Sequence, residues 1–441
     1  MAFRLGTPLL FTLSICLPCL AKQPHPATPP PATASAAAPA PAQLPLDDLR
    51  VFTKAFENIR THYVKDISDT KLLEYAMKGM LSELDPHSAY LDSSSLEDLQ
   101  NHTSGEFGGL GIEVGQEDGL IKVVSPIDDT PASRAGIEAG DLIIKIDDLA
   151  VKGISVEDAI EKMRGAKGSK VVLSILRKKQ DKPLVMTLVR DIIKVRSVRY
   201  EVIDKDYAYI RLSQFQVKTG DDLVAAIAKL QQENHLKGAV LDLRNNPGGV
   251  LQASVAVADA FMDGGLVVYT EGRLAQSNEK FYAQPKDLLN GLPLVVLIND
   301  GSASASEIVA GALQDAKRAV VMGTRSFGKG SVQTVIPLAE TKAMKLTTAL
   351  YFTPKGRSIQ AQGIEPDVVV ERAKITALES RGTMSEAELG GHLANGTGAE
   401  EVKSDARRKE GEAAKNGLLQ KDNQLFEAIN LLKGLNILKQ G

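Results

Sequence analysis

A serine and a lysine, each in a loop of small residues, are the side chains whose types and spacing point most directly to chemistry. The serine lies in Gly301–Glu307 (GSASASE), and Lys329, in the stretch 327–333 (FGKGSVQ), follows Ser304 by 25 residues. A serine hydroxyl becomes a strong nucleophile when a base takes its proton, and a lysine can be that base if burial keeps its amine neutral. The two loops therefore predict a hydrolase site that works through serine and lysine.

The two loops resemble the active-site motifs of the carboxy-terminal processing (tail-specific) proteases, a family of serine peptidases. Three further stretches resemble signatures of the same family: 84–91 (LDPHSAYL), 105–112 (GEFGGLGI) and 242–249 (DLRNNPGG). The similarity is collinear and extends from roughly Leu46 to Val370. It implies that Ser304 is the nucleophile, that Lys329 is the general base and that Gln333 orients the lysine.

The serine loop also predicts where the oxyanion of a tetrahedral intermediate would bind. Ser304 is expected where a turn ends and a helix begins, so the unpaired backbone N–H of Ala305 can donate to an oxyanion. A second donor is expected from the tight turn after a core strand, and the register of the family similarity indicates Gly249. Ser302 and Ser306 are equivalent to Ser304 on local grounds, since each could cap the helix, and only the resemblance selects Ser304.

Lys329 has a second functional interpretation, because residues 323–330 (GTRSFGKG) nearly match a phosphate-binding P-loop. The match fails at Gly330, which replaces the serine or threonine that would hold Mg²⁺. It also fails in context, since a helix should follow a P-loop and 332–337 (VQTVIP) is typical of a strand. We therefore predict no nucleotide site. A solvated surface lysine is the remaining alternative, and it does not account for Gln333 and the serine loop together.

From Tyr207 onward the pattern alternates between buried strands and helices, which predicts an α/β core. The expected strands are 239–243, 292–298 and 319–322, and the expected helices are 251–262 and 304–316. The family resemblance implies a more specific fold. It is a crotonase-like (ClpP-like) protease core of spiral βαβ repeats, with an inserted PDZ domain and helical N- and C-terminal segments.

A PDZ domain is expected at about residues 104–195. The strand beginning at residue 112 would be the edge to which a peptide adds, and 156–163 would be the helix beside the peptide groove. Backbone N–H groups of a glycine loop can hold the C-terminal carboxylate of such a peptide. The residues that resemble this carboxylate-binding loop are Gly109, Leu110, Gly111 and Ile112.

The N-terminal stretch predicts export rather than a folded domain. Arg4 supplies positive charge, residues 8–21 form a short apolar run, and small residues precede a cleavage site after Ala21. The Ala/Pro-rich stretch that follows cannot bury a core and predicts an extended tether. Both cysteines, Cys16 and Cys19, would leave with the signal peptide, so the mature chain would contain no disulfide.

The last segment of the chain predicts a helix with an apolar stripe: Leu418, Leu425, Ile429, Leu432 and Leu435. Such a helix after a polar linker can fold back on its own core or pair with another subunit. We favour the pairing, and hence a homo-oligomer, because an exposed stripe is costly. The expected segments are a signal peptide (1–21), an Ala/Pro-rich linker (22–45), an N-terminal helical region (46–103), the PDZ domain (104–195), the protease core (196–372), a charged linker (373–417) and the C-terminal helix (418–441).

Composition argues against several classes of function. A net charge of −3 gives no footprint for nucleic acid. None of the six histidines is followed by glutamate, so the helix motif of zinc proteases is absent, and we expect no metal or other cofactor. We interpret His87 as bonding a turn and Arg244 as a structural ion-pair partner.

Together these patterns predict a serine endopeptidase of exported proteins, whose PDZ domain recognises, or is regulated by, substrate C-terminal tails. The resemblance implies a periplasmic location, protein substrates of the cell envelope and, in some relatives, a helical-repeat adaptor lipoprotein. Two rival functions are weaker. Acyl-CoA binding by a crotonase-type fold conflicts with export and lacks a recognisable CoA site. A PDZ scaffold with an inactive core conflicts with the intact Ser304, Lys329 and Gln333.

Overall fold

The structure is a computed structural model, and it describes residues 45–127, 129–178, 180, 182–374, 386, 389–393 and 422–439. The predicted signal peptide, nearly all of the Ala/Pro-rich linker and most of the charged linker lie outside these residues. The chain divides into two units, Met1–Leu72 and Leu73–Gly441.

The described part of the first unit contains helix α1 (Leu46–His62) and the start of α2 (Asp69–Ser82). Asp47 and Asp48 in the first turn of α1, with Arg60 in its last turn, complement the helix dipole. Helix α1 belongs to the N-terminal region that was predicted to be helical. None of its residues is buried.

Residues 106–194 form a small β-rich body with its own apolar core. Its main sheet has the order β3-β4-β5-β7-β8, with β6 on β5, and β2 pairs with β9 in a separate ribbon. Ile121, Ile143 and Leu173 are fully buried in one cluster with Ala159 of α5. The elements are β2 (Glu106–Gly109), β3 (Ile112–Glu117), β4 (Leu120–Pro126), α4 (Pro131–Arg134), β5 (Leu142–Ile146), β6 (Leu149–Ala150), α5 (Val156–Met163), β7 (Lys170–Leu176), β8 (Leu184–Val189) and β9 (Asp191–Lys194).

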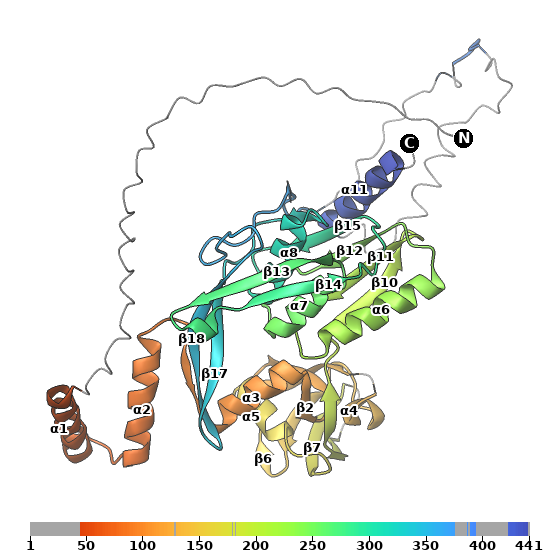
Figure 1. Ribbon diagram of the computed structural model, residues 1–441. Coiled ribbons are helices and arrows are strands. Elements are labelled where there is room, and N and C mark those ends of the chain that lie inside the picture. Colours follow the sequence, from red (N-terminus) through yellow and green to blue (C-terminus); the bar gives the residue numbers. More distant parts are fainter. Residues whose placement is uncertain are drawn as a thin grey trace, which may run out of the picture. The chain divides into compact units, whose positions relative to one another are not determined.

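A six-stranded sheet with the order β10-β11-β12-β15-β16-β19 forms the centre of the remaining chain (Figure 1). Strand β10 is antiparallel to β11, and the other neighbours are parallel. The elements of this layer and its helices are β10 (Val198–Ile203), β11 (Tyr207–Leu212), α6 (Thr219–Glu233), β12 (Gly238–Asp242), α7 (Leu251–Asp259), β15 (Leu294–Ile298), α8 (Ala305–Asp315), β16 (Val320–Gly323), β19 (Val368–Val369) and α11 (Asn423–Lys439).

Successive side chains of the central strands face opposite sides of this sheet. In β15, Val296 and Ile298 pack in the core with α6, α7 and α8, whereas Val295 and Leu297 pack with α11. A parallel sheet that is covered on both faces has no polar side, which explains the continuous apolar runs in its strands.

Antiparallel strands form a second sheet, which carries part of the candidate site. Its order is β1-β18-β13-β14, and β17 pairs with β18. The strand predicted after Lys329, in place of a P-loop helix, is confirmed as β17. The elements around this sheet are β1 (Ala89–Leu91), α3 (Ser93–Ser104), β13 (Asp263–Gly272), the 3₁₀ turn η1 (Ala275–Ser277), β14 (Lys280–Pro285), β17 (Ser331–Ala339) and β18 (Lys342–Phe352).

The C-terminal helix corrects one expectation. In α11, Leu425, Ile429 and Leu432 are buried in one cluster with Val295 and Leu297 of the central sheet. The prediction that this stripe is unpaired, and therefore pairs with another subunit, is wrong, because the far face of the sheet needs an apolar cover and the helix supplies it. Leu418 lies outside the described residues. A homo-oligomer built in some other way stays a prediction.

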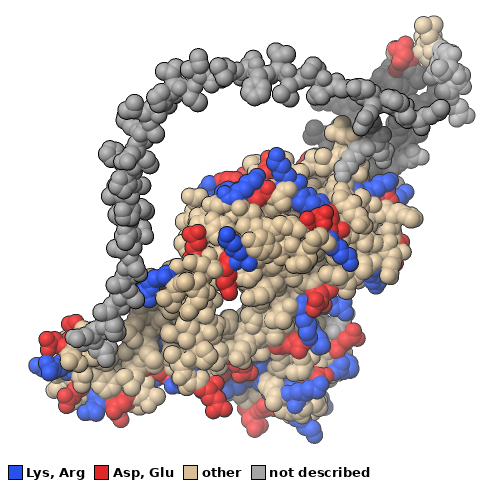
Figure 2. Space-filling model, in the orientation of Figure 1, with Lys and Arg blue, Asp and Glu red and all other residues tan. Residues whose placement is uncertain are grey.

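Charges of both signs are mixed over the described surface in Figure 2. Neither colour gathers into a single large patch on the face shown, which agrees with the net charge of −3. The electrostatic footprint of a nucleic-acid-binding protein is not seen on this face.

Candidate active site

Ser304 lies between β15 and α8 and is the N-cap residue of that helix. Its backbone has φ 57° and ψ −113°, which costs a non-glycine residue on the order of 1–3 kcal/mol. Backbone strain of this kind is concentrated at functional sites. The strained turn lies against Gly248, where an added Cβ would be 2.7 Å from both Ala303 O and Ser304 Cβ, so this approach requires glycine.

One buried carboxylate joins the serine loop to the lysine loop. Glu307 is fully buried, and its Oε2 accepts from Ser304 N at 2.7 Å and from Lys329 N at 2.9 Å. Its Oε1 accepts from Ser326 Oγ at 2.6 Å and from Gly328 N at 2.7 Å. The structure thus brings the two predicted loops together around a residue for which no role was predicted.

The hydroxyl of Ser304 contacts a buried tyrosine on β18. Ser304 Oγ lies 2.7 Å from Tyr351 Oη, and Tyr351 is 3% exposed. Burial raises the pKa of this tyrosine, so its phenol is neutral at physiological pH. Its backbone N–H donates to Gly330 O at 2.9 Å. Tyr351 therefore contacts both the serine loop and the lysine loop.

Lys329 is half-buried in the loop that leads into β17. Burial lowers the pKa of its amine, the positive charge of Lys345 lowers it further, and the negative charge of Glu307 opposes both effects. A lowered pKa favours the neutral amine that a general base needs. Among the described residues the amine has no hydrogen bond or ion pair, so the two loops meet without a direct bond from Lys329 to Ser304.

Gln333 lies on β17 and contacts hydroxyl groups rather than the lysine amine. Its Nε2 donates to Ser331 Oγ at 2.9 Å and to Thr347 Oγ1 at 3.4 Å. Thr347 Oγ1 donates in turn to Asp85 Oδ1 at 3.1 Å, which connects the LDPHSAYL motif to this sheet. Orientation of the lysine by Gln333 therefore stays a prediction.

His87 of the same motif lies close enough to Lys329 to be affected by its charge. Burial lowers the pKa of His87, and the charge of Lys329 lowers it further. The backbone N–H of His87 donates to Asp85 Oδ1 at 2.8 Å, and a structural role for its imidazole stays a prediction.

Two backbone N–H groups are open at the predicted oxyanion site. Ala305 is the first residue of α8, and Gly249 directly follows the glycine that approaches Ser304. Within the part of the chain that the structure describes, neither the Ala305 N–H nor the Gly249 N–H has an acceptor. The Gly248 N–H donates to Asn246 Oδ1 at 2.9 Å, so Gly249 is the available donor of the two glycines.

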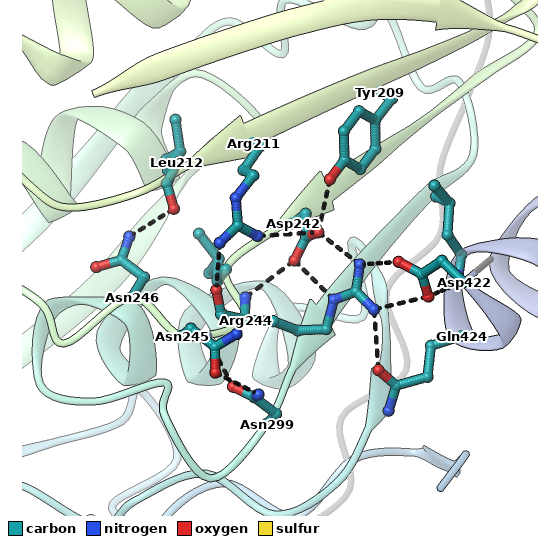
Figure 3. Close-up of polar contacts among 12 residues, drawn as sticks. Tyr209, Arg211, Leu212, Asp242, Arg244, Asn245, Asn246, Asn299, Asp422 and Gln424 are labelled. Carbon is teal, nitrogen blue, oxygen red and sulfur yellow. Dashed lines mark hydrogen bonds and ion pairs between the residues drawn. The ribbon is translucent and has the colours of Figure 1, made fainter. Parts of the chain in front are cut away.

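A polar cluster supports the glycine turn at the end of β12 (Figure 3). Asp242 is fully buried and accepts from Tyr209 Oη at 2.8 Å, while Arg211 and Arg244 form ion pairs with it at 3.2 Å and 2.7 Å. Arg244 also pairs with Asp422, at 2.6 Å, just before α11. The ion-pair role predicted for Arg244 is confirmed, and it extends to the C-terminal segment.

The serines on either side of Ser304 hold its loop against this turn. Ser302 Oγ donates to Leu243 O at 2.8 Å, and Ser306 Oγ donates to Asn246 O at 2.9 Å. Both side chains are fully buried. Their hydroxyls are therefore structural links, which distinguishes them from the partly exposed Ser304 in a way that local sequence could not.

The predicted carboxylate-binding loop lies between β2 and β3. Gly109 ends β2, and the N–H groups of Leu110 and Gly111 have no acceptor among the described residues. Ile112 begins β3, which is the edge strand of its sheet. An extended peptide could therefore add to β3 and place its carboxylate at the two open N–H groups.

The sequence interpretation missed two side chains of this site. Glu307 follows Ser304 by three residues, and Ser-x-x-Glu is a capping-box pattern that could have indicated a bond back to the serine N–H. Tyr351 carries no such pattern, because it is 47 residues from Ser304 and reaches it only through the pairing of β17 with β18.

No cluster of three or more histidine, cysteine, aspartate or glutamate side chains suited to a metal ion occurs in the described residues. Within the described part of the chain, no helix is both long enough and sufficiently apolar to cross a membrane.

Three family profiles match the chain. Peptidase family S41 matches residues 206–370, the PDZ domain matches 108–188, and the N-terminal domain of the activating protease CtpB matches 27–95, in part outside the described residues. The candidate site lies mainly within the first of these matches, and the predicted carboxylate-binding loop lies within the second.

Similarity to known proteins extends over most of the chain. A carboxy-terminal-processing protease of Bartonella bacilliformis is 50% identical over 388 residues, which are 87% of this chain and 88% of that protein. The carboxy-terminal processing protease CtpA of Bacillus subtilis is 36% identical over 341 residues, 76% of this chain and 72% of that protein. A solved photosystem II D1 C-terminal processing protease is 30% identical, with a TM-score of 0.44, and the match covers 73% of this chain and 92% of that chain.

Proposed function

The chain belongs to peptidase family S41, as a carboxy-terminal processing protease with a PDZ domain, and from this premise we propose that Ser304 and Lys329 form its catalytic dyad. We propose exported proteins of the cell envelope as its substrates. The enzyme is a serine peptidase, which requires one activated serine and one base.

The observation that carries the proposal is the carboxylate shared by the two loops. Oε2 of Glu307 accepts from the backbone N–H of Ser304 and from that of Lys329. One atom therefore sets the distance between the segment that carries the nucleophile and the segment that carries the base. The burial that lowers the pKa of Lys329 supports the same assignment.

The proposed reaction follows the usual two steps of serine peptidases. Ser304 Oγ attacks the scissile carbonyl while its proton moves to the neutral amine of Lys329, and the N–H groups of Gly249 and Ala305 donate to the oxyanion. Collapse of the intermediate breaks the C–N bond, and Lys329 returns the proton to the leaving amine. Water then hydrolyses the acyl-enzyme by the same route. In apo structures catalytic hydrogen bonds are often not yet formed, so the unbonded amine of Lys329 is compatible with this role.

We propose that the PDZ domain recognises substrate C-terminal tails at Gly109–Ile112 and regulates the site. Glu106 of β2 accepts from Lys218 Nζ at 2.9 Å. Three residues before Lys218, Phe215 N donates to Gly248 O at 2.9 Å, and Val250 N donates to Phe215 O at 2.9 Å. A peptide that shifts the β2 region can therefore act on the segment that holds the glycine turn.

The N-terminal pattern of charge, apolar run and small residues supports export, so we propose a periplasmic location. We also propose a helical-repeat adaptor lipoprotein as one partner, because the family resemblance implies it. We also infer that the core is a crotonase-like (ClpP-like) variant, because parallel strands β11, β12, β15 and β16 alternate with helices on one face.

Casein digestion by Ser304→Ala and Lys329→Ala variants tests the dyad. We expect both substitutions to abolish proteolysis and leave thermal unfolding close to that of the wild type, since both side chains are at least partly exposed. Lys286→Ala, which changes an exposed lysine outside both loops, is the matched control and should remain active. Full activity of the Lys329→Ala variant would exclude this lysine as the base.

A further inference from the structure

We propose that Tyr351 is a further catalytic residue of this site, which donates a hydrogen bond to Ser304 Oγ and stabilises the negative charge that develops there during attack. The proposal rests on the proposed function of Ser304 as nucleophile. Its geometric basis is the 2.7 Å separation between Tyr351 Oη and Ser304 Oγ.

Burial decides which of the two hydroxyl groups is the donor. Tyr351 is 3% exposed, and the described residues offer its hydroxyl no hydrogen-bond partner other than Ser304 Oγ. If Ser304 donated to Tyr351, the proton of the buried phenol would have no acceptor, which is a costly arrangement. If Tyr351 donates, its own proton is satisfied, and the proton of the partly exposed Ser304 stays free for a base.

The position of Tyr351 is held by the backbone as well as by packing. Its N–H donates to Gly330 O at 2.9 Å, directly after Lys329, and its ring belongs to the main apolar core. The phenol is therefore placed by a paired strand rather than by a loose loop. A group that is fixed in this way costs no reorganisation when charge appears on its partner.

In the proposed step Tyr351 neither gives up nor accepts a proton. The Oγ–H bond of Ser304 breaks as its Oγ–C bond forms, the proton goes to Lys329 Nζ, and the carbonyl π electrons move to the oxygen held by Gly249 and Ala305. Tyr351 keeps its proton throughout, because burial keeps the phenol neutral. Its contribution is one charge-assisted hydrogen bond to the reacting oxygen.

The test is Tyr351→Phe in the full chain, which removes the hydroxyl and leaves the ring in the core. Initial rates on fluorescein-labelled casein give kcat and KM, and the rate of serine labelling by diisopropyl fluorophosphate reports nucleophilicity without peptide binding. We expect kcat to fall roughly 10- to 100-fold, the labelling rate to fall in parallel and KM to stay unchanged. The pH at which activity rises should stay in place, because Lys329 sets it.

Tyr269→Phe is the matched control. Tyr269 lies on β13 and stacks on Phe352 at 5.2 Å, and its hydroxyl has no hydrogen bond within the described chain. This variant should match the wild type in every assay, and thermal unfolding of both variants shows whether the fold is kept.

Two results would overturn the assignment. A Tyr351→Phe variant with unchanged kcat and labelling rate would show that the hydroxyl has no part in the reaction, and a faster variant would show that it restrains the serine. The Ser304→Ala variant separates these results from failure of the proposed function. If Ser304→Ala keeps its activity, the dyad itself is wrong, whereas an inactive Ser304→Ala beside a normal Tyr351→Phe rejects the tyrosine alone.

Discussion

Two buried carboxylates hold the loops of this site, and their charges are balanced in different ways. Asp242, behind the glycine turn, is paired with two guanidinium groups, those of Arg211 and Arg244 (Figure 3). Glu307, beneath the serine and lysine, forms none of the ion pairs found in the described residues and instead accepts from three backbone N–H groups and one hydroxyl. Both side chains are fully buried.

This difference indicates different roles: Asp242 stabilises the fold, whereas Glu307 positions the two reacting loops. At Asp242 opposite charges meet, so the cluster can join distant segments, including Asp422, into one stable unit. At Glu307 the donors are the backbone groups of the reacting loops, so the carboxylate sets the places of Ser304 and Lys329 and keeps a negative charge near the amine. We therefore expect changes at the two carboxylates to be detected by different measurements.

Among substitutions at or beside these two carboxylates, Glu307→Gln should reduce activity most, because Glu307 bonds directly to the loops that carry Ser304 and Lys329. An amide offers one acceptor oxygen where the carboxylate offers two, and its NH₂ group would face N–H donors. We expect kcat/KM on casein to fall by about 100-fold or more, since small displacements of reacting groups are costly. A normal kcat/KM with an intact fold would show that Glu307 does not position the loops.

Arg244→Met should act on stability more than on chemistry. It removes one of the two cations of Asp242 and the partner of Asp422, and breaking a buried pair costs about 3–5 kcal/mol. Urea denaturation measures the change in the free energy of unfolding. Arg325→Met is the control, because its ion pair with Glu365 is exposed and should be worth less than about 1 kcal/mol. Equal effects of the two variants would contradict a structural cluster at Asp242.

Lys345→Gln should change activity least, and its effect should be seen in the pH dependence of the reaction. Burial and the charge of Lys345 both lower the pKa of Lys329, and the base acts only when its amine is neutral, above that pKa. Activity should therefore rise with pH through the pKa of Lys329. Removal of the Lys345 charge raises that pKa and moves the rise to higher pH, with Lys286→Gln as a control that leaves it in place. A kcat/KM profile that moves to lower pH, or stays fixed, would show that Lys345 does not tune the base.

Much of the fold follows from local pattern. Strand β15 and helix α8 were predicted because a continuous apolar run, a turn and a helical segment are contiguous in the chain. The groove helix was predicted with its observed bounds, Val156–Met163, because the segment resembles the corresponding helix of a PDZ domain. The PDZ domain, as a profile match, and the S41 family are likewise confirmed.

Local pattern could not predict which surface covers the apolar stripe of the C-terminal helix. The apolar spacing of Leu425, Ile429 and Leu432 predicts a helix with one buried face, and that much was correct. What covers the face depends on whether the central sheet has a second uncovered side. This is a property of the assembled strands, so the choice of another subunit as the cover was wrong.

The residue types of the site and the segments that carry them could be predicted from the sequence alone, because motifs such as GSASASE and FGKGSVQ are local and their chemistry depends on composition and spacing. Three contacts could be seen only in the folded chain: Glu307 joins the two loops, Tyr351 reaches Ser304, and Gln333 contacts Thr347. These contacts join residues on different elements, and their distances follow from strand pairing and helix packing rather than from separation along the chain. Hydrogen bonds require partners within about 3 Å, and that precision arises only when the whole core is packed.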